Sequence, residues 1–397
     1  MRVLFTCGAE YGHLHSLLPL ARSLVERDHE VVFALPDSFR IRAETAGFAT
    51  LPVGLDREAV ARELNLRFPE WRDVPADGLL EFALVTIGGR VMAPAMVRGL
   101  VPAITSFGAD LLVHGPAVLG GPIAAAATGI PSVNHGWGPL LGLRELDLAA
   151  NAVAPLWEEY SLAPEPRGGM FRYLYLDVCP PSLQTPEIAT IATASPLRPV
   201  PADGVGGEAL PGWVESLPDR PTVYVSLGTF CNRFTHLFLT ILAGLRDAPV
   251  NVVVTVGYDQ DPAALGPQPA HVHVARYIPT SQVVPRCRLV VSHGGSATVL
   301  AALRSGVPLL LVPQGHDQLK NAERCAAIGV GRWLKAEEFT AEAVSEAVRD
   351  VLGDPAYELA ARAVQQEFEA MPGPEEVVGV LEALARDHTP LDRAPGG

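Results

Sequence analysis

The segment from Val290 to Asn321, V-V-S-H-G-G-S-A-T-V-L-A-A-L-R-S-G-V-P-L-L-L-V-P-Q-G-H-D-Q-L-K-N, decides the fold of this chain. Its apolar start predicts a short strand at Leu289 to Ser292, followed by a turn at His293 to Ser296. A helix of small and apolar residues to about Arg304 and a buried strand, Val307 to Val312, come next. Such a unit directs a helix toward the carboxyl end of a parallel strand, so we expect an α/β fold.

The turn after the first of these strands has the composition of a phosphate site. A helix that begins there presents unpaired backbone N–H groups, and Gly294 and Gly295 would let an anion approach the backbone closely. Ser296 and Thr298 add hydroxyl donors, and His293 can donate to a phosphate oxygen. The ordinary alternative is a tight turn whose serine caps the helix.

Polar residues after the next strand extend this site. Asp317, Gln318 and Asn321 are predicted to lie at the same edge of the sheet, where ligands of open α/β folds bind. A carboxylate beside an amide suits paired sugar hydroxyls, whereas it would repel a second phosphate. The segment therefore predicts a site for a sugar nucleotide.

Four motifs resemble the nucleotide-sugar signature of family 1 glycosyltransferases. They are Y-I-P-T-S-Q-V-V-P (Tyr277 to Pro285), S-H-G-G-S-A-T, G-V-P-L-L-L-V-P and D-Q-L-K-N-A. The closest likeness is to actinobacterial enzymes of the calicheamicin-type branch, which glycosylate antibiotics and related natural products. The resemblance covers nearly the whole chain, and it implies the GT-B fold: α/β, with two doubly wound Rossmann-like domains facing across a deep cleft.

The resemblance also assigns nucleotide-binding residues in the second half. Gly228 and Thr229 match a loop that faces the diphosphate in the family. Tyr277 stands where relatives usually have a tryptophan that stacks on the nucleotide base, and the neighbouring backbone at Ile278 would contact the edge of that base. A tyrosine ring can still stack, with less area.

The N-terminus has a second strand–turn–helix–strand pattern. A strand at Met1 to Thr6 precedes a glycine-containing turn at Gly8 to His13, an apolar helix at Leu17 to Arg27 and a strand at Glu30 to Ala34. The turn carries His13 and His15; a lone histidine at such a place is ordinarily a solvated or capping residue. The resemblance makes His13, in the Gly12-His13 motif, the general base, and places His15 in the acceptor pocket or on the surface.

Many relatives carry an acid that hydrogen-bonds this histidine. It follows the strand that corresponds to Asp110 to Val113, and here the matching position is Gly115. Either His114 or a nearby polar group substitutes for the acid, or the base works without an orienting carboxylate.

Two further segments are candidates for the acceptor pocket. Residues 57 to 101, with Phe82, have the apolar spacing of an amphipathic helix, and related enzymes line the acceptor pocket with this region. His135-Gly136-Trp137-Gly138 ends a predicted strand and leaves room for a ligand beside His135 and Trp137. The alternative for this second segment is a turn packed by a core tryptophan.

Composition limits the class of protein. Hydrophobic residues make up 48% of the 397 residues and charged residues 19%, enough apolar sequence for two packed cores. The net charge of -14 argues against nucleic-acid or acidic-membrane partners. Five dispersed cysteines predict neither a zinc site nor disulfides, and neither a membrane-spanning apolar run nor a signal peptide is expected, so we predict a soluble, cytoplasmic protein.

A segment rich in proline and glycine, Thr193 to Arg220, predicts a linker. We therefore expect an acceptor-binding domain at 1–200 and a nucleotide-sugar-binding domain at 215–374, with a final helix at about 375–390 that packs back on the first domain.

The predicted activity is inverting, metal-independent transfer of a sugar, with no cofactor besides the donor substrate. The donor is a nucleoside diphosphate sugar, TDP-linked by resemblance although UDP stays open, and the acceptor is a small hydrophobic aglycone such as a polyketide. The alternatives are a sugar-nucleotide epimerase of the same fold and a non-catalytic or auxiliary relative. The oligomeric state is open, a homodimer included.

Overall fold

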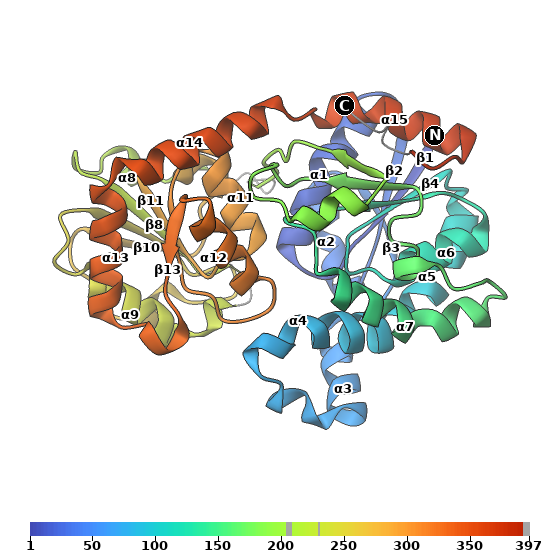
Figure 1. Cartoon of the computed structure of the whole chain (residues 1–397), viewed down its shortest axis with the longest axis horizontal. Helices are drawn as coiled ribbons and strands as arrows, with labels where there is room; N and C mark the ends of the chain where they lie inside the picture. Colours follow the sequence, from blue (N-terminus) through green and yellow to red (C-terminus); the bar gives the residue numbers. More distant parts are fainter. Residues whose placement is uncertain (204–208, 229–230, 392–397) are drawn as a thin grey trace. The chain divides into compact units, whose positions relative to one another are not determined.

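The computed structural model of the chain describes residues 1–203, 209–228 and 231–391 (Figure 1). It divides into two compact units. Unit 1 comprises Met1–Cys179, Gln184–Ala202 and Met371–Gly397, and unit 2 comprises Pro180–Leu183 and Asp203–Ala370. Each unit contains one parallel β-sheet, so the expectation of two Rossmann-like α/β domains is confirmed.

The sheet of unit 1 has seven strands, all paired in parallel. In sheet order these are β3 (Ala49–Pro52), β2 (Glu30–Leu35), β1 (Arg2–Thr6), β4 (Leu111–His114), β5 (Ser132–His135), β6 (Leu174–Asp177) and β7 (Ala194–Pro196). Starting from β1, the strands β2 and β3 follow on one side of the sheet, and β4 to β7 follow on the other side. Because parallel crossovers are right-handed, this reversal places helices on both faces of the sheet.

Helices of unit 1 follow from this topology. One face is covered by α5 (Ala93–Phe107), α6 (Gly120–Thr128) and α7 (Leu143–Glu159), which share a core with Leu4 of β1 and Leu112 of β4. The crossovers among β1, β2 and β3 are made by α1 (Tyr11–Val25) and α2 (Arg40–Thr45). The predicted helix at Leu17 to Arg27 therefore begins six residues earlier than expected, and His13 and His15 lie inside it.

A long helical segment precedes α5. The helices α3 (Arg57–Arg67) and α4 (Leu79–Phe82) lead into a π-helical stretch, Ala83–Met92, which continues into α5. The continuous segment Ala76–Phe107 is long and apolar enough to cross a membrane by length and composition, and 44% of its most apolar window is buried inside the protein. This corrects the expectation that no segment reaches such a length, because charged residues such as Arg90 interrupt the apolar run without ending the helix.

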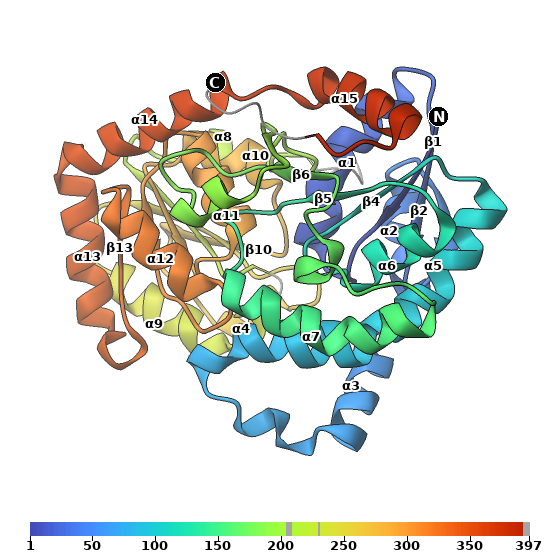
Figure 2. The same cartoon turned by 45° about the vertical axis from the view of Figure 1, so that its right-hand side comes forward.

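The last helix, α15 (Pro374–Asp387), packs on α1, as Figures 1 and 2 show from two directions. Arg27 donates from Nη2 to the Glu375 carbonyl at 3.0 Å, and His29 Nε2 lies 2.9 Å from Glu382 Oε1. Buried apolar residues line the contact face of α15: Val377, Val378, Leu381 and Leu384.

The expected linker contains a strand. Within Thr193 to Arg220, Ala194–Pro196 forms β7 and pairs with β6, and Arg198 N donates to the Pro372 carbonyl at 2.8 Å. A strand of three residues that ends in proline has little apolar periodicity, so the composition of this segment concealed it.

Unit 2 has six parallel strands with helices on both faces. In sheet order the strands are β10 (Val272–Ala275), β9 (Asn251–Thr255), β8 (Thr222–Ser226), β11 (Leu289–Ser292), β12 (Leu309–Leu311) and β13 (Gly331–Trp333). Its helices are α8 (Gly212–Glu215), α9 (Thr235–Leu245), α10 (Thr280–Val283), α11 (Ser296–Arg304), α12 (Gln318–Ala327), α13 (Ala341–Gly353) and α14 (Pro355–Ala370). The predicted strand Val307 to Val312 is shorter in the structure, and α12 begins before Asn321 rather than after it.

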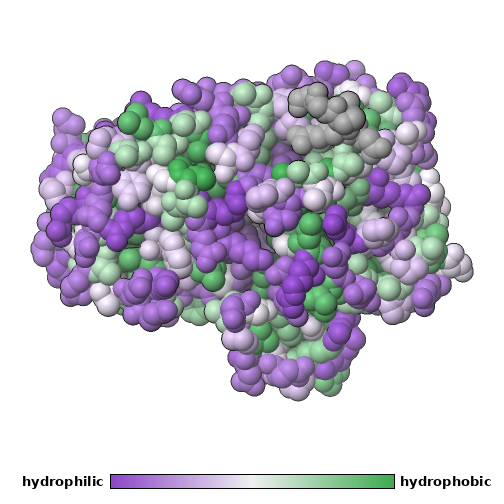
Figure 3. Space-filling view, viewed as in Figure 1, coloured by the Kyte–Doolittle hydropathy of each residue, from purple (hydrophilic) through white to green (hydrophobic). Residues whose placement is uncertain are grey.

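The core of unit 2 joins β8, β9 and β11 to α9 and α13. The central strands β9 and β11 are buried along their whole length, as parallel strands covered on both faces should be. The face of unit 2 seen in Figure 3 is mostly hydrophilic, with apolar residues scattered among polar ones. All five cysteines are free and buried.

Candidate active site

The site in unit 2 lies where the strand order reverses. Strands β8 and β11 are neighbours, and successive strands lead away from them in opposite directions. Loops that follow these two strands therefore diverge at the carboxyl edge of the sheet, where open α/β folds bind ligands. Gly228 follows β8, and His293, Gly294 and Gly295 follow β11. Thr229, the next predicted residue, lies outside the described residues.

The His293 ring lies between Gly228 and Gly295. A Cβ atom at Gly228 would lie 2.5 Å from His293 Cε1, and one at Gly295 would lie 2.5 Å from Nε2. Side chains at either position would collide with the ring, so the two glycines are what allow it to be there. Burial lowers the pKa of His293 to about 4, with a smaller contribution from His316, so the ring is neutral at pH 7.

The N-terminus of α11 follows this histidine. The helix begins at Ser296 with Gly295 as its N-cap, and no side chain caps it. Thr298 N and Val299 N donate to the Gly295 carbonyl at 3.1 Å, whereas the N–H groups of Ser296 and Ala297 have no partner within the helix and lie at the positive end of the helix dipole. Thr298 is the third residue of the helix and is half-buried. These groups form an anion-binding arrangement of the kind expected from the sequence.

The Ser296 hydroxyl is engaged within the protein. It lies 2.9 Å from Asp317 Oδ2 and, because a carboxylate only accepts, the serine donates its proton. Asn321 Nδ2 donates to the Gly294 carbonyl at 2.9 Å and to Ser296 Oγ at 3.1 Å. Asn321 and Asp317 thus hold the start of α11 in place.

Gln318 supports the adjacent loop. Its side chain is buried, and Oε1 accepts a hydrogen bond from the Gln314 backbone at 2.9 Å. The backbone at His316 adopts a φ of 57°, unusual for a residue with a side chain, and this loop places His316 close enough to influence the pKa of His293. His316 lies within the segment Val290 to Asn321, but no role was predicted for it.

Two tyrosines stack beside this edge. The rings of Tyr277 and Tyr258 have centroids 4.3 Å apart and planes inclined by 22°. Tyr277 is half-buried, and Ile278 next to it is fully buried. Tyr258 follows β9 and was not predicted; an aromatic residue shortly after a buried strand was the available signal.

The corresponding reversal in unit 1 is at β1 and β4. The loop after β1 leads into α1, whose third residue is His13. The His13 ring stacks on Trp137, which follows β5, with centroids 4.1 Å apart and planes inclined by 9°. The fold therefore brings together two residues that the sequence analysis assigned to different roles.

The surroundings of His13 keep it neutral. Burial and, to a smaller extent, the nearby positive charge of Arg57 lower its pKa to about 4. Arg57 is held by Glu10 Oε2 at 2.6 Å and by the Ala9 carbonyl at 3.1 Å. No side chain in the described part of the chain donates to or accepts from the His13 ring, so Trp137 is the contact that fixes its plane.

The two other histidines predicted near the carboxyl edge, His114 and His135, are buried within the fold. His114 is the last residue of β4, fully buried, with Nδ1 3.0 Å from the Gly115 carbonyl; His135 ends β5, with Nδ1 2.7 Å from the Gly136 carbonyl. A carbonyl oxygen only accepts, so Nδ1 carries the proton in both rings. Burial lowers both pKa values to about 4. Both are neutral residues built into the carboxyl edge of the sheet.

The remaining predicted acceptor residues lie on helices. His15 is on α1, where its ring meets the edge of Tyr11 at 6.1 Å, and Phe82 ends α4, half-buried.

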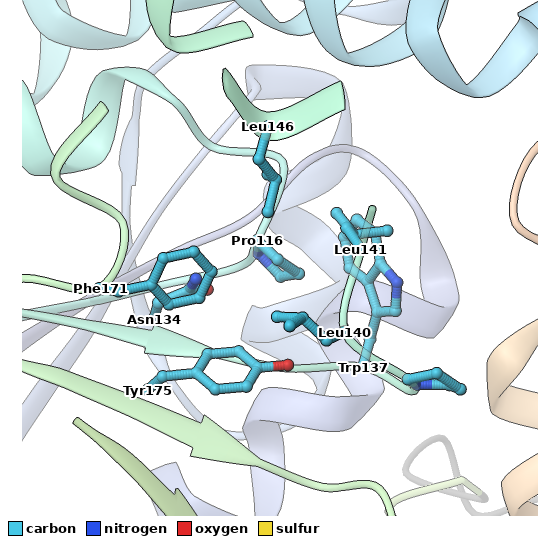
Figure 4. Close-up of a pocket in the computed structure, with 9 residues that line it drawn as sticks. Pro116, Asn134, Trp137, Leu140, Leu141, Leu146, Phe171 and Tyr175 are labelled. Carbon is cyan, nitrogen blue, oxygen red and sulfur yellow. The ribbon is translucent and has the colours of Figure 1, made fainter. Parts of the chain in front are cut away.

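A small hollow, with a volume of about 10 Å³, lies beside Trp137 in unit 1 (Figure 4). Apart from Asn134 and Tyr175 its lining is apolar: Pro116, Trp137, Pro139, Leu140, Leu141, Leu146 and Phe171. Trp137 is thus both a wall of this hollow and the stacking partner of His13. Among residues 1–203, 209–228 and 231–391, no group of three or more His, Cys, Asp or Glu side chains could hold a metal ion.

Comparisons with known proteins agree with this arrangement. Residues 78–228 match the model of the erythromycin biosynthesis protein CIII-like N-terminal domain, and residues 240–384 match the model of the corresponding C-terminal domain. Together the two matches cover most of the chain.

Curated relatives match over nearly their full length. The L-demethylnoviosyl transferase of Streptomyces niveus is 31% identical, over 98% of this chain and 100% of the relative. The 10-deoxymethynolide desosaminyltransferase of Streptomyces venezuelae is 28% identical, over 98% of each.

A solved structure of similar fold is the spinosyn rhamnosyltransferase. It is 26% identical, with a TM-score of 0.81, over 96% of this chain and 100% of that chain. It has also been solved with thymidine diphosphate and with the spinosyn aglycone. From the family models, the full-length relatives and the two Rossmann-like sheets, the chain belongs to the family 1 glycosyltransferases of GT-B fold that build antibiotics and related natural products.

Proposed function

We propose that this glycosyltransferase moves a deoxysugar, the class of sugar that its relatives' names indicate, from a TDP-linked donor to a hydroxyl of a polyketide-like or aromatic aglycone. The observation that carries the proposal is the neutral His13 stacked on Trp137 at the wall of an apolar hollow. The names of the desosaminyl and demethylnoviosyl transferases, and the thymidine diphosphate bound to the spinosyn enzyme, support the donor and acceptor classes.

In the proposed reaction His13 removes the proton from the acceptor hydroxyl. The oxygen then attacks the anomeric carbon from the face opposite the nucleoside diphosphate, which leaves with the bonding electron pair, so the anomeric configuration inverts. First-turn N–H groups of α11 stabilise the negative charge on the departing diphosphate. The proposed reaction uses no metal ion and no further cofactor.

We assign Trp137 the positioning of His13. Relatives implied by the sequence resemblance use an acid for this purpose, and Gly115 cannot. A flat indole 4.1 Å from the imidazole restricts rotation of the ring. It also attracts the imidazolium that forms when the proton is taken, because a cation over an indole face is stabilised.

The remaining assignments belong to the same proposal. Unit 1 binds the acceptor and unit 2 the donor, with Gly228, Thr229, His293 and α11 at the diphosphate and Tyr277 and Ile278 at the base. Asp317 and Gln318 are assigned to the sugar; in this structure both also brace the start of α11 and its neighbouring loop. We place the enzyme in the cytoplasm.

The test is turnover with TDP and UDP sugars and a panel of aromatic and polyketide acceptors. We expect nucleoside diphosphate release only when acceptor is present, and a fall in kcat of roughly two to four orders of magnitude in His13→Ala. His236→Gln, at an exposed position on α9, is the matched control and should keep full activity.

Other outcomes would redirect the proposal. Full turnover by His13→Ala would remove His13 as the base. Conversion of the donor without acceptor would indicate an epimerase, and donor binding without turnover would indicate an auxiliary protein. A product whose anomeric configuration matches that of the donor, measured by NMR coupling constants, would contradict inversion.

A further inference from the structure

Tyr258 and Tyr277 form a two-layered aromatic stack in unit 2. Their ring centroids are 4.3 Å apart, their planes are inclined by only 22°, and both side chains are half-buried. Tyr258 follows β9 and Tyr277 follows β10, two strands that pair in parallel. Both rings therefore lie at the carboxyl edge of the sheet, where open α/β folds bind ligands.

Hydrogen bonds hold the two tyrosine-bearing loops together. Gly257 N donates to the Arg276 carbonyl at 2.8 Å, and Arg276 Nη1 donates to the Tyr258 carbonyl at 2.9 Å. Gly257 precedes Tyr258 and Arg276 precedes Tyr277 in the chain. These bonds fix the backbone on both sides of the stack, so the two rings are kept in contact by the fold.

Gly257 also joins this pair of loops to the loop after β8. Its φ is +90°, and a Cβ atom there would lie 2.4 Å from Asn232 Nδ2 and 3.8 Å from the Gly228 carbonyl oxygen. Gly228 belongs to the loop that is assigned to the diphosphate. The loop that carries Tyr258 therefore packs against the diphosphate loop, as the two ends of one bound nucleotide require.

The stack leaves one face of the Tyr277 ring for a ligand. A ring has two faces, and Tyr258 covers one of those of Tyr277. A half-exposed tyrosine without such a neighbour moves among several staggered rotamers. The apparent affinity of a ligand falls with the fraction of molecules that hold the competent rotamer. Contact with Tyr258 raises that fraction.

We propose that Tyr258 is a positioning residue of the donor site, which holds the Tyr277 ring in the plane on which the nucleotide base stacks. The inference rests on the proposed function, in which Tyr277 receives the base. The bound state is then a stack of three layers, with the base on Tyr277 and Tyr277 on Tyr258. Tyr258 acts through Tyr277 and contacts neither the diphosphate nor the reacting atoms.

Calorimetric titration of the full chain with TDP tests this role. Tyr258→Leu should weaken TDP binding roughly fivefold, whereas Tyr258→Phe keeps a stacking ring and should bind TDP like the native protein. Trp213→Leu is the matched control. It removes a comparable stack from the same unit, that of Trp213 on His273 with centroids 4.8 Å apart, and should leave TDP affinity unchanged.

A double variant shows whether Tyr258 acts through Tyr277. Tyr277→Leu should weaken TDP binding more than Tyr258→Leu does, and adding Tyr258→Leu to it should cause no further loss, because the ring to be positioned is gone. An additive loss would mean that Tyr258 binds the base directly, and it would overturn the positioning role. Unchanged TDP affinity in Tyr258→Leu would overturn it as well.

Steady-state kinetics separates positioning from general damage to the fold. The stack contributes equally to the bound donor and to the transition state, so Tyr258→Leu should raise KM for the TDP sugar about fivefold and leave kcat unchanged. A merely structural role would lower kcat with the amount of folded enzyme. A lower kcat at an unchanged KM would therefore contradict the proposal.

The two proposals fail separately. If the native protein binds TDP and Tyr277→Leu binds it equally well, the assignment of the base in the proposed function fails, and this inference fails with it. If Tyr277→Leu weakens TDP binding and Tyr258→Leu does not, only this inference fails. His13→Ala should preserve all these differences in binding while it loses turnover, since binding needs no catalysis.

Discussion

The stacking of Trp137 on His13 can be tested by substitution of the tryptophan. Trp137→Leu should lower kcat about tenfold, since the imidazole loses the surface that fixes its plane and stabilises its cation. Trp137→Phe keeps an aromatic face and should recover most of kcat, although both variants raise KM by enlarging the hollow. Steady-state kinetics at saturating acceptor separates the two effects.

The comparison between the two Trp137 variants is decisive. A purely structural role would lower kcat in proportion to the loss of folded protein, with no advantage for phenylalanine. Equal kcat values for the Leu and Phe variants, at equal unfolding temperatures, would contradict the positioning role.

Arg57 should set the acidic limb of the pH profile. Burial and Arg57 hold the pKa of His13 at about 4, so the neutral base is present above that pH and kcat/KM should not fall between pH 8 and 6. Arg57→Gln removes a repulsive charge and frees the Glu10 carboxylate, and both changes favour the imidazolium. The acidic limb should therefore move to higher pH.

Arg62→Gln is a suitable comparison, because Arg62 lies exposed on the same helix, α3. Profiles of kcat/KM against pH that coincide for Arg57→Gln and the native enzyme would show that Arg57 does not act on the base.

The sequence was sufficient to identify His13 but not the residues that surround it. His13 stood out because it belongs to a short local motif. Its contact with Trp137 joins α1 to the end of β5, and its lowered pKa depends on Arg57 from α3; neither is encoded in local spacing.

At the scale of elements, two glycines allow a test of the loop after β8. Gly228, in this loop, and Gly266, which lies between β9 and β10, have φ values of +64° and +68°, so alanine is strained at both. Only at Gly228 would the new Cβ meet a neighbour, the His293 ring at 2.5 Å, whereas nothing lies within 4 Å at Gly266. Gly228→Ala should therefore weaken TDP binding roughly tenfold or more, by displacing His293 from the site.

Calorimetric titration with TDP checks this expectation. Gly266→Ala should bind TDP like the native protein while it shows a similar loss of stability from backbone strain. Unchanged TDP affinity in Gly228→Ala would separate the His293 ring from nucleotide binding.

Elements were predictable where apolar periodicity was long. The buried strands β1, β2 and β11 appear within a residue of their predicted positions. The start of α1 was missed because Gly12 lowers helix propensity, yet the Glu10 carbonyl accepts from His13 N and Leu14 N and begins the helix there. The first turn of α1 therefore forms despite its weak local signal.

Acid should destabilise the two units unequally. His13, His114 and His135 in unit 1 and His293 in unit 2 have pKa values of about 4, lowered chiefly by burial from an ordinary 6.5, and burial also lowers the pKa of His316 in unit 2. The unfolded chain therefore binds more protons between pH 6.5 and 4, and the free energy of unfolding falls as pH drops through this window. At pH 5.5 each histidine costs about 1 kcal/mol relative to pH 7.5.

Hydrogen exchange at pH 7.5 and 5.5, followed by mass spectrometry, resolves the two units. Because unit 1 holds three of the four histidines with a pKa of about 4, its core strands should lose more protection free energy than those of unit 2, after correction for intrinsic exchange. A larger loss in unit 2 would contradict this assignment of pKa values.

For the whole molecule, the sequence was sufficient to predict two parallel sheets, because each half repeats the pattern of buried strand, glycine turn and helix. It was not sufficient to predict which residues complete each unit. The segment Pro180–Leu183 belongs to unit 2, where Ser182 N donates to Glu367 Oε2 at 2.8 Å. Contacts of that kind depend on the folded surface rather than on composition.

The return of α15 to α1 has a consequence for how the protein is made. A ribosome synthesises Met1–Cys179 and Gln184–Ala202 of unit 1 before Asp203–Ala370, the main part of unit 2, and only then the helix that covers the apolar face of α1. Domains usually fold in the order of their synthesis. Here unit 1 begins first and is completed last. A nascent chain that stalls at Ala370 therefore carries a complete unit 2, whereas the apolar face of α1 in unit 1 is still uncovered and can bind chaperones.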